Sequence, residues 1–334
     1  MRAFVTGATG MLGSRLAERL VADGHEVTVL VRSTSDRSVF DGLPVTLSEG
    51  ALPDETERLA QTLRSQEWVF HCAAMVDDWA DREEMYRTNV SGLASLIAAT
   101  DRRALRRFVY VSSMAVLGMS PQIDLDENAP VVSTGDNYNF TKIEAEKLAL
   151  RHAEEGLPIT IVRPPYIYGP RDRQFFPRVV DALRDGTFKY IGGGGAALSL
   201  VYVENLVDAM MLAAKNERTT GEVFMITDGE PITRRELIET IAAGLGLPKP
   251  SKSVPLWVAK AACPLFELVA KLKGGRKPPL LNRFRLKFMA TPLTFNIAKA
   301  RRVLGYEPRF STPEGLARTI AWHKKQREAP QPSP

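Results

Sequence analysis

The sequence predicts an α/β protein with a doubly wound parallel sheet and a smaller, mostly helical C-terminal lobe. A glycine-rich turn follows the first short apolar run within the first twenty residues. Short apolar runs then alternate with helix-like segments through the first half of the chain, a pattern typical of a parallel sheet built from β–α–β crossovers. At 334 residues the chain can bury a large core and hold one large domain or two smaller ones.

The segment from Arg2 to Leu20 predicts a strand, a tight turn and a helix. Ala3–Val5 is a short apolar run, and leucines then recur at the four-residue spacing of one helix face. Between the two, glycines follow the spacing G-x-x-G-x-x-G. The leucines are Leu12, Leu16 and Leu20, and the glycines are Gly7, Gly10 and Gly13.

Such a turn suits the pyrophosphate of a dinucleotide. Gly7 lets the chain reverse tightly, Gly10 removes a side chain that would keep a pyrophosphate off the backbone, and Gly13 lets the helix lie close to the strand. The amino end of the helix presents unpaired N–H groups and a partial positive charge to the phosphates. The turn therefore predicts a dinucleotide site of the Rossmann type.

Further strands are predicted where short apolar runs lie between helix-like segments. They are Glu26–Val31, Val45–Leu47, Trp68–His71, Phe108–Ser112, Ile159–Val162 and Glu222–Thr227. Ligands of such sheets bind at the carboxyl ends of the strands, where the strand order reverses. We therefore expect functional residues directly after these strands.

The end of the second strand predicts which nicotinamide cofactor is bound. An acidic residue there hydrogen-bonds the ribose hydroxyls of NAD(H), whereas an arginine suits the 2′-phosphate of NADP(H). Val31 stands where the acid is expected, and Arg32 follows it. We predict a preference for NADP(H), with NAD(H) as the alternative, and we expect Arg32 to bind the phosphate with help from Arg37. The competing interpretation of Arg32 is a surface arginine without a ligand.

The sequence YNFTK places Tyr138 and Lys142 four residues apart, about one turn apart on one helix face. Ketone reduction needs a hydride and a proton for the oxygen, and a tyrosine with a pKa of about 10 is a poor proton carrier at neutral pH. A nearby ammonium favours the phenolate and lowers that pKa. The pair therefore predicts a proton-transferring tyrosine that is assisted by a lysine.

The amino-terminal TGATGMLG resembles the cofactor fingerprint of the short-chain dehydrogenase/reductase superfamily, in its extended branch. Other segments resemble motifs of the same branch in the same order along nearly the whole chain. They are HCAA at residues 71–74, VSSMAVLG at 111–118, Tyr138 with Lys142, RPPYIYGP at 163–170, and the K-A-x-x-x-L-G-Y-x-P pattern at 299–308.

The resemblance implies roles for individual residues. Ser113, 25 residues before Tyr138, is expected to hydrogen-bond the substrate carbonyl, with Ser112 as the second candidate. Lys142 is also expected to hold the nicotinamide ribose. In the segment near the adenine, Asp54 matches the family pattern, whereas Ala51 stands where an acid is usual. The expected cofactor contacts are Gly7, Thr9, Gly10, Met11, Leu12, Arg32, Leu52, Asp54, Ala73, Ala74, Tyr138, Lys142 and Pro165.

Within the extended branch the chain is most similar to the 3β-hydroxysteroid dehydrogenase and dihydroflavonol reductase-like group. That similarity implies an NAD(P)-dependent oxidoreductase that interconverts a secondary alcohol and a ketone on a hydrophobic small molecule, such as a sterol, a long-chain β-keto compound or a flavonoid. One alternative is a nucleotide-sugar epimerase or dehydratase that retains NAD. Another is a protein of the same fold that senses the cofactor without catalysis.

The resemblance also suggests a division of the chain. Residues 1–165 form the dinucleotide-binding domain, to which 200–227 return, and residues 166–199 and 228–325 form the substrate lobe. Residues 254–288 combine apolar residues at helix spacing with basic ones, which suits either a helix packed on the lobe or a peripheral contact with a membrane surface. The proline-rich residues 326–334 are expected to be disordered.

Composition narrows the remaining classes. The net charge of +5 is modest and no nucleic-acid motif accompanies it, so we expect no nucleic-acid partner. Two cysteines, Cys72 and Cys263, are too few for a disulfide framework, and no Cys/His cluster has metal-ligand spacing. We expect a cytoplasmic protein, with membrane association as an option, and a homodimer paired through the helices around Asn89 and Tyr138, as the resemblance implies.

Overall fold

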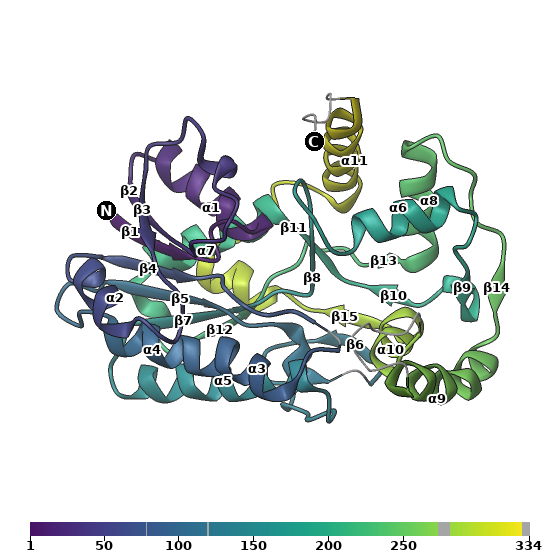
Figure 1. Cartoon of the computed structure of the whole chain (residues 1–334), viewed down its shortest axis with the longest axis horizontal. Coiled ribbons are helices and arrows are strands. Elements are labelled where there is room, and N and C mark those ends of the chain that lie inside the picture. The colour runs from purple at the N-terminus through teal and green to yellow at the C-terminus, as the bar shows by residue number, and fades with distance from the viewer. Residues whose placement is uncertain (78, 119, 273–280, 329–334) are drawn as a thin grey trace.

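The computed structural model describes residues 1–77, 79–118, 120–272 and 281–328, and its centre is a seven-stranded parallel sheet (Figure 1). The strand order is β12-β7-β5-β4-β1-β2-β3, so the order reverses between β1 and β4. The strands are β1 (Arg2–Thr6), β2 (Glu26–Val31), β3 (Val45–Glu49), β4 (Trp68–His71), β5 (Arg107–Val111), β7 (Ile159–Arg163) and β12 (Val223–Met225). The predicted doubly wound α/β fold is confirmed.

Helices cover both faces of this sheet. On one face pack α1 (Met11–Ala22) and α7 (Val203–Lys215), and on the other pack α2 (Thr56–Leu63), α4 (Gly92–Ala99) and α5 (Asn137–Glu154). Alternate strand residues serve the two faces, because successive strand side chains point to opposite sides. In β1, Ala3 and Val5 belong to the core under α1, and Phe4 belongs to the core under α4 and α5. The predicted leucine stripe of α1 is buried.

A smaller four-stranded sheet lies beside the main one, in the order β13-β10-β15-β6 (Figure 1). Its strands are β13 (Ile232–Thr233), β10 (Ala197–Leu198), β15 (Leu293–Phe295) and β6 (Gln122–Leu125). Three come from the region expected to form the substrate lobe, whereas β6 comes from the first 165 residues. The chain therefore crosses into the second sheet directly after the serines that follow β5.

The return of the chain to the main sheet differs in detail from the prediction. Residues Leu200–Tyr202 (β11) pair with β8 (Tyr166–Tyr168) in a separate two-stranded sheet, and only β12 joins the main sheet. Because β8 follows the two prolines after β7, it diverges from the main sheet, and β11 follows it. A second two-stranded sheet joins β9 (Tyr190–Ile191) to β14 (Ser253–Val254).

The remaining helices lie mostly in the C-terminal half. They are α3 (Arg82–Tyr86), α6 (Phe176–Arg184), α8 (Arg234–Gly244), α9 (Leu256–Leu272), α10 (Arg283–Ala290) and α11 (Thr312–Glu328). Short 3₁₀ turns occur at 38–40, 114–117, 192–194 and 217–219, and π-helical turns at 87–91 and 300–304. The predicted disordered tail begins too early, because α11 continues to Glu328. The rest of that tail, 329–334, lies outside the described residues.

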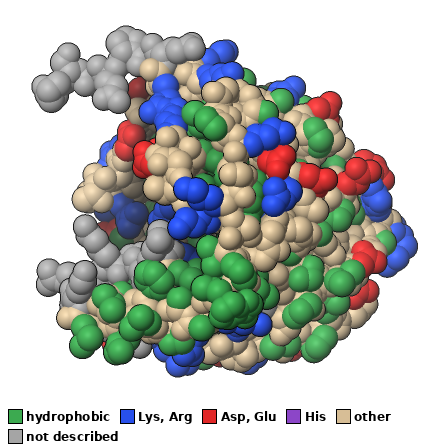
Figure 2. All heavy atoms as spheres, turned by 90° about the vertical axis from the view of Figure 1, so that its right-hand side faces the viewer, with side chains coloured by type: hydrophobic (Ala, Val, Ile, Leu, Met, Phe, Trp, Pro, Cys, Tyr) green, Lys and Arg blue, Asp and Glu red, His purple; other side chains and the backbone are tan. Residues whose placement is uncertain are grey.

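Helix α9 leaves one face uncovered. Its inner face, with Ala259 and Cys263, packs against Leu286 of α10. Its outer face carries six exposed apolar side chains, and Figure 2 shows hydrophobic side chains gathered over this part of the surface. They are Trp257, Leu265, Phe266, Leu268, Val269 and Leu272. In the described part of the chain, no helix has the length and hydropathy needed to cross a bilayer. Residues 273–280 of the predicted membrane-contacting segment lie outside the described residues.

Candidate active site

The glycine turn brings three backbone segments into close contact. Gly7 has a φ of 69°, and a Cβ on it would lie 2.7 Å from the backbone nitrogen of Ala73. A Cβ on Gly13 would lie 2.4 Å from the carbonyl oxygen of Gly7. Side chains at these positions are therefore excluded by contact with backbone, which cannot move aside. The turn, the start of α1 and the segment after β4 form one compact cradle.

The amino end of α1 is open in this cradle. Gly10 is the exposed N-cap residue, and no side chain caps the helix there. Its neighbours in the turn, Thr9 and Met11, are half-buried, whereas Leu12 is turned into the core. The first N–H groups of a helix have no partner within the helix and attract anions. The residues present therefore fit the pyrophosphate of a dinucleotide cofactor.

Thr6, which the sequence analysis did not single out, ties the end of β1 to the segment after β4. Its hydroxyl lies 2.8 Å from Nδ1 of His71 and accepts a hydrogen bond of 3.3 Å from the N–H of Ala73. Burial lowers the pKa of His71 to about 3, so its ring is neutral at ordinary pH. His71 thus has a structural role in this arrangement, and Ala73 and Ala74 lie half-buried beside the turn.

At the end of β2, the two predicted phosphate-binding arginines differ. Arg37 forms an ion pair of 2.5 Å with Glu49 on the neighbouring strand. Arg32 is exposed at the carboxyl end of β2, and its guanidinium pairs with no carboxylate among the described residues. Arg32 is therefore available to an anion in a way that Arg37 is not.

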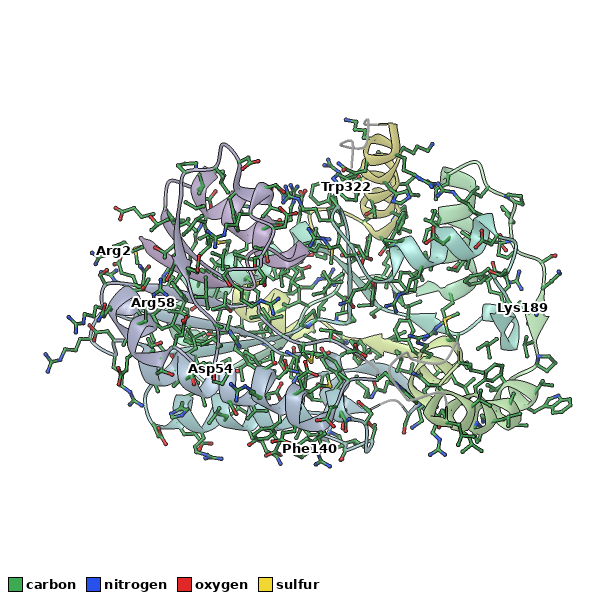
Figure 3. All side chains as sticks on the ribbon, viewed as in Figure 1. Arg2, Asp54, Arg58, Phe140, Lys189 and Trp322 are labelled. Carbon is green, nitrogen blue, oxygen red and sulfur yellow. The ribbon has the colours of Figure 1, made fainter. Side chains whose placement is uncertain are left out.

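The loop after β3 holds the two residues expected near the adenine. Asp54 is exposed and forms an ion pair with Arg87 (Figure 3), and Leu52 lies against α4 close to Gly92. The carboxylate that reaches back into this loop belongs to Glu55, which accepts a hydrogen bond of 3.0 Å from the N–H of Ala51. The acidic side chain that contacts the backbone of this loop is thus Glu55, and not its neighbour Asp54.

Tyr138 and Ser113 form the centre of the candidate site. Both are half-buried, and the Ser113 hydroxyl lies near enough to the Tyr138 phenol to favour the phenolate, an effect smaller than that of burial. The Ser113 oxygen also accepts a hydrogen bond of 3.1 Å from the N–H of Ala115, which begins the short turn at 114–117. Because that N–H occupies an acceptor position on the serine oxygen, the serine O–H hydrogen is free to be donated to another oxygen.

Lys142 lies one turn further along α5 and is almost fully buried. Its ammonium donates a hydrogen bond of 3.0 Å to the backbone oxygen of Val111, at the end of β5. Burial lowers the pKa of Lys142 to about 8. Burial also raises the pKa of Tyr138 to about 12, against the predicted lowering by Lys142. The physical reason is that loss of hydration disfavours the phenolate and outweighs the hydrogen bond from Ser113.

The second candidate serine, Ser112, is used differently. It is buried and donates a hydrogen bond of 2.6 Å to the carboxylate of Glu146, which also forms a buried ion pair with Arg163. This carboxylate stabilises the charge of Lys142 from the next turn of α5. Ser112 therefore belongs to a buried network behind the site, and Ser113 is the serine that contacts Tyr138.

Two buried asparagines, Asn139 and Asn89, hold the segments of the site together, and the sequence analysis assigned this role to neither. Asn139, next to Tyr138, donates hydrogen bonds to the oxygens of Ala115 (2.7 Å) and Val132 (3.0 Å), so it holds the turn after Ser113 against α5. Asn89 bonds both backbone groups of Met75 and the hydroxyl of Thr141. In the sequence, the only sign of Asn139 is an amide residue within a predicted helix. Its role in holding the turn follows from its hydrogen bonds to Ala115 and Val132, which only the structure shows.

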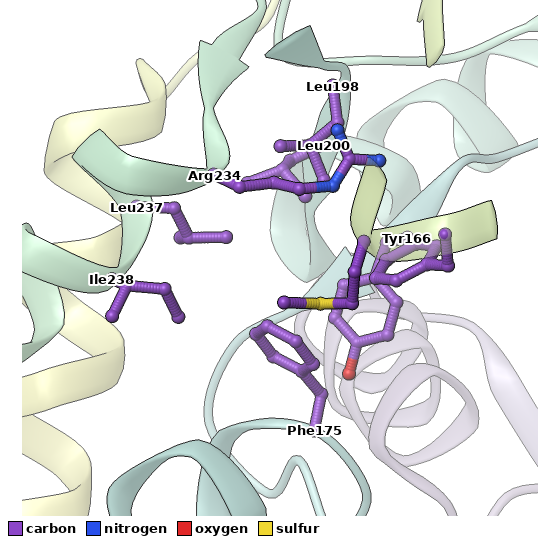
Figure 4. Close-up of a pocket in the computed structure, with 9 residues that line it drawn as sticks. Tyr166, Phe175, Leu198, Leu200, Arg234, Leu237 and Ile238 are labelled. Carbon is purple, nitrogen blue, oxygen red and sulfur yellow. The ribbon is translucent and has the colours of Figure 1, made fainter. Parts of the chain in front are cut away.

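The segment after β7 passes directly beside the serines. The backbone oxygen of Pro164 accepts a hydrogen bond of 3.0 Å from the N–H of Met114, and Pro165 is buried. Two residues after Pro164, Tyr166 reaches a small apolar cavity of about 10 Å³ between β8, α8 and α10 (Figure 4). Its lining residues are Tyr166, Phe175, Leu198, Leu200, Arg234, Leu237, Ile238, Phe288 and Met289.

The arrangement combines a cofactor cradle, a hydroxyl pair and an apolar cavity on one side of the sheet reversal. In the ranges that the structure describes, no group of three or more His, Cys, Asp or Glu side chains is placed to hold a metal ion. The hydroxyl groups of Ser113 and Tyr138 are suited to proton transfer and to hydrogen bonding with a substrate oxygen.

Comparisons with known proteins follow the same lines. A family model described as the NAD dependent epimerase/dehydratase family matches residues 3–227. The chain is 34% identical over 320 residues to 4-hydroxy-2-methyl-3-oxo-4-farnesyl-3,4-dihydroquinoline-1-oxide ketoreductase of Stigmatella aurantiaca, covering 95% of each chain. It is 30% identical over 329 residues to 2-alkyl-3-oxoalkanoate reductase of Stenotrophomonas maltophilia, covering 96% of this chain and 99% of that one.

Similarity extends also to plant enzymes and to solved structures. The chain is 32% identical over 320 residues to 3beta-hydroxysteroid-dehydrogenase/decarboxylase isoform 1 of Arabidopsis thaliana, covering 91% of this chain and 72% of that one. The crystal structure of gox2253 matches with a TM-score of 0.81 and 30% identity, covering 97% of this chain and 98% of that one. UDP-glucose 4-epimerase from Thermotoga maritima shares the fold, with a TM-score of 0.78 and 22% identity over 98% of this chain and 100% of that one.

Proposed function

We propose that this protein, which belongs to the NAD-dependent epimerase/dehydratase family of extended short-chain dehydrogenases/reductases, interconverts a ketone and a secondary alcohol. Its relatives support an NAD(P)-dependent oxidoreductase acting on hydrophobic substrates. The observation that carries the proposal is the closeness of the Ser113 hydroxyl to the Tyr138 phenol. It places two hydroxyl groups together where one carbonyl oxygen can be bound by both.

The two hydroxyl groups have complementary tasks in this proposal. Ser113 donates its O–H to the substrate carbonyl, because its oxygen already accepts the N–H of Ala115. Tyr138 supplies the proton that the oxygen needs when the ketone is reduced. Its pKa of about 12 keeps the phenol protonated at neutral pH, so it can act as the acid without prior proton uptake.

The cofactor side of the site rests on Gly7, Gly10 and the open amino end of α1. A nicotinamide cofactor bound there supplies the hydride. Lys142, held by the oxygen of Val111, is the residue we assign to the nicotinamide ribose, and its charge favours a negative charge developing on the tyrosine oxygen. We assign the remaining contacts as in the sequence analysis, with Ala73 and Pro165 lining the path between cradle and substrate.

We also propose that NADP(H) is preferred. Arg32 supports this preference, since it stands at the end of β2 without a carboxylate partner in the described ranges. An arginine at this position can neutralise a 2′-phosphate, whereas an acid would hydrogen-bond the free ribose hydroxyls. The proposed homodimer stays a prediction.

The names of the relatives offer three substrate classes: long-chain oxo acids, steroids and dihydroflavonols. The direct test is a screen of NADPH and NADH oxidation against ketones of these classes, with UDP-glucose as the control. We expect turnover with at least one hydrophobic ketone and none with the nucleotide sugar. Purification with tightly bound NAD and turnover of UDP-glucose alone would contradict the proposal and favour the epimerase alternative.

A further inference from the structure

Arg234 is a buried cation without a counter-ion. It is the first residue of α8, whose start is set by the capping box of Thr233 and Glu236. Its side chain is turned inward, and the residue is only 3% exposed. Nη1 donates hydrogen bonds to the backbone oxygens of Ala196 (2.9 Å) and Ala197 (3.4 Å), which anchor one side of the guanidinium.

The other side of the guanidinium is unused. Nε and Nη2 are buried and have no hydrogen-bond partner. Burial alone lowers the pKa of Arg234, to about 10, and no acidic side chain among the described residues offsets it. Arg163 gives the contrast, because its equally buried guanidinium is paired with Glu146. A buried charge without a partner is costly, so an arginine kept in this state points to a partner from outside the chain.

Arg234 is one of the residues that line the apolar cavity, and its unpaired Nε and Nη2 are buried behind the cavity's apolar surface (Figure 4). Opposite them lie Tyr166 and Phe175, while Leu237 and Ile238 continue the wall along α8. Along the chain, Tyr166 follows two residues after Pro164, whose backbone oxygen accepts the N–H of Met114, the residue after Ser113. The wall thus offers one cation among aliphatic and aromatic side chains.

This combination selects a particular ligand chemistry. Apolar walls suit a hydrocarbon body, and two free N–H groups on one guanidinium match the two oxygens of a carboxylate. A diphosphate carries more charge and more acceptors than this lining can satisfy, because every other lining residue except the Tyr166 phenol is apolar, and that phenol donates to Asp172. The cavity holds only about 10 Å³, so binding of such a ligand requires its wall side chains to move apart.

We propose that Arg234 binds the carboxylate of an apolar substrate, which makes the substrate an amphiphilic oxo acid rather than a neutral sterol or flavonoid. That the bound carboxylate belongs to the substrate rests on the proposed ketone reduction. The existence of an anion site at Arg234 does not depend on that reaction. Arg234 is a specificity residue here, and Ser113 and Tyr138 remain the reacting pair.

The first test measures binding without turnover. Thermal unfolding is followed with dodecanoate, and with its methyl ester and dodecanol as neutral controls of the same chain length. We expect dodecanoate to raise the Tm of the wild type well above the effect of the neutral ligands, and we expect Arg234→Leu to abolish that difference. The matched control is Arg235→Leu, because Arg235 lies next on the same helix but binds Glu239 and the oxygen of Gly193.

A second variant separates binding from folding. Arg234→Lys keeps the charge but cannot make the paired contact, so we expect a reduced yet measurable response to dodecanoate. Equal shifts with acid and ester in the wild type, or a full response in a folded Arg234→Leu protein, would overturn the proposal. A shift with UDP and none with dodecanoate would overturn it in favour of a nucleotide.

The kinetic test compares a long-chain 3-oxo acid with its methyl ester. We expect Arg234→Leu to raise the KM for the acid by about tenfold or more, with the ester unaffected, since a hydrogen bond to a charged group is lost only for the acid. If neither ketone is reduced while the dodecanoate shift persists, the proposed reaction fails and the anion site stands. If both are reduced equally well by wild type and variant, the anion site fails and the reaction stands.

Discussion

The ammonium of Lys142 donates a hydrogen bond of 3.0 Å to the backbone oxygen of Val111. This contact ties the middle of α5 to the end of β5, and the two serines of the site follow that strand end directly. Glu146, one turn further along α5, binds Ser112 and stabilises the charge of the same lysine. Two buried polar contacts, Lys142 with Val111 and Glu146 with Ser112, therefore fix the position of the helix that carries Tyr138 relative to the segment that carries Ser113.

Replacing Tyr138 with phenylalanine should remove the proton donor and little else. We expect kcat to fall by about 10²–10⁴, the usual contribution of a positioned acid, while cofactor affinity stays within a few-fold. Stopped-flow absorbance for turnover and a fluorescence titration with NADPH measure the two effects. Tyr86→Phe is the matched control, because Tyr86 is exposed and stacks on Phe140. Near-normal turnover of Tyr138→Phe would refute its role.

The two serines should respond differently to alanine substitution. Ser113→Ala is expected to lower kcat by about 10²–10³, the cost of losing a donor to a carbonyl oxygen. Ser112→Ala is expected mainly to destabilise the fold, by about 1–3 kcal/mol, because the buried Glu146 loses a donor. Steady-state kinetics and urea unfolding of both variants separate the effects, and the reverse pattern would transfer the catalytic role to Ser112.

Cofactor choice should depend on Arg32. We expect Arg32→Ala to raise the KM for NADPH by about tenfold or more, as for a lost charge-assisted contact, with the KM for NADH unchanged. Arg37→Ala should leave the ratio of the two KM values near that of the wild type, because Arg37 is paired with Glu49. Equal KM values for both cofactors in the wild type would remove the predicted preference.

Acid should destabilise the protein through His71. Its folded pKa is about 3, against 6.5 for the unperturbed group, so between these values the unfolded chain binds a proton that the folded one does not. The contribution of His71 to stability is complete above about pH 6.5 and is lost as the pH falls through this range. The full effect is on the order of 4–5 kcal/mol. Urea unfolding at several pH values measures the free energy of unfolding as a function of pH, and this dependence should be shallower for His71→Gln than for the wild type. An unchanged pH dependence would show that His71 is not its cause.

The outer face of α9 should bind anionic membranes. Residues 251–290 contain nine Lys and Arg and one Glu, so this segment more than accounts for the net charge of +5. A basic segment beside an exposed apolar helix face suits anionic lipid. A single helix of about 25 Å offers less area than the about 800 Å² per partner of a standard protein interface.

Vesicle flotation tests this prediction. We expect binding to vesicles containing phosphatidylglycerol, weaker binding at high salt, and little to phosphatidylcholine alone. Trp257→Ser with Leu268→Ser should abolish flotation, whereas Ile123→Ser, at a side chain equally exposed on β6, should not. Absence of flotation with anionic vesicles would leave the face to another partner.

Much of the cofactor half could be predicted because its signals are local. The spacing of Gly7, Gly10 and Gly13 lies within one strand–turn–helix unit, and the structure confirms the close approaches that these glycines permit. The parallel sheet follows from alternation along the chain in the same way. Tyr138 and Lys142 needed only the period of one helix to be placed on the same side.

The tertiary structure decided everything that depends on contacts between distant segments. It separated Ser113 from Ser112, which are neighbours in sequence, because Glu146 on another element binds only Ser112. It also reversed the expected direction of the Tyr138 pKa, since burial raises this pKa more strongly than the nearby Ser113 hydroxyl lowers it. Periodicity reports which face of an element is buried, but it contains no information on which polar group lies across the interface.

Arg234 marks that limit most clearly. In the sequence it is one of two adjacent arginines at the start of a capped helix, and nothing local distinguishes it from Arg235. Folding turns Arg235 to the surface, where Glu239 pairs with it, and buries Arg234 beside an apolar cavity without a counter-ion among the described residues. The sequence by itself determined the parallel sheet, the glycine turn before α1 and the placing of Tyr138 and Lys142 one turn apart on one helix, because these depend on local spacing. Only the tertiary structure determined which charges are left unpaired, because pairing depends on what each side chain meets after the chain has folded.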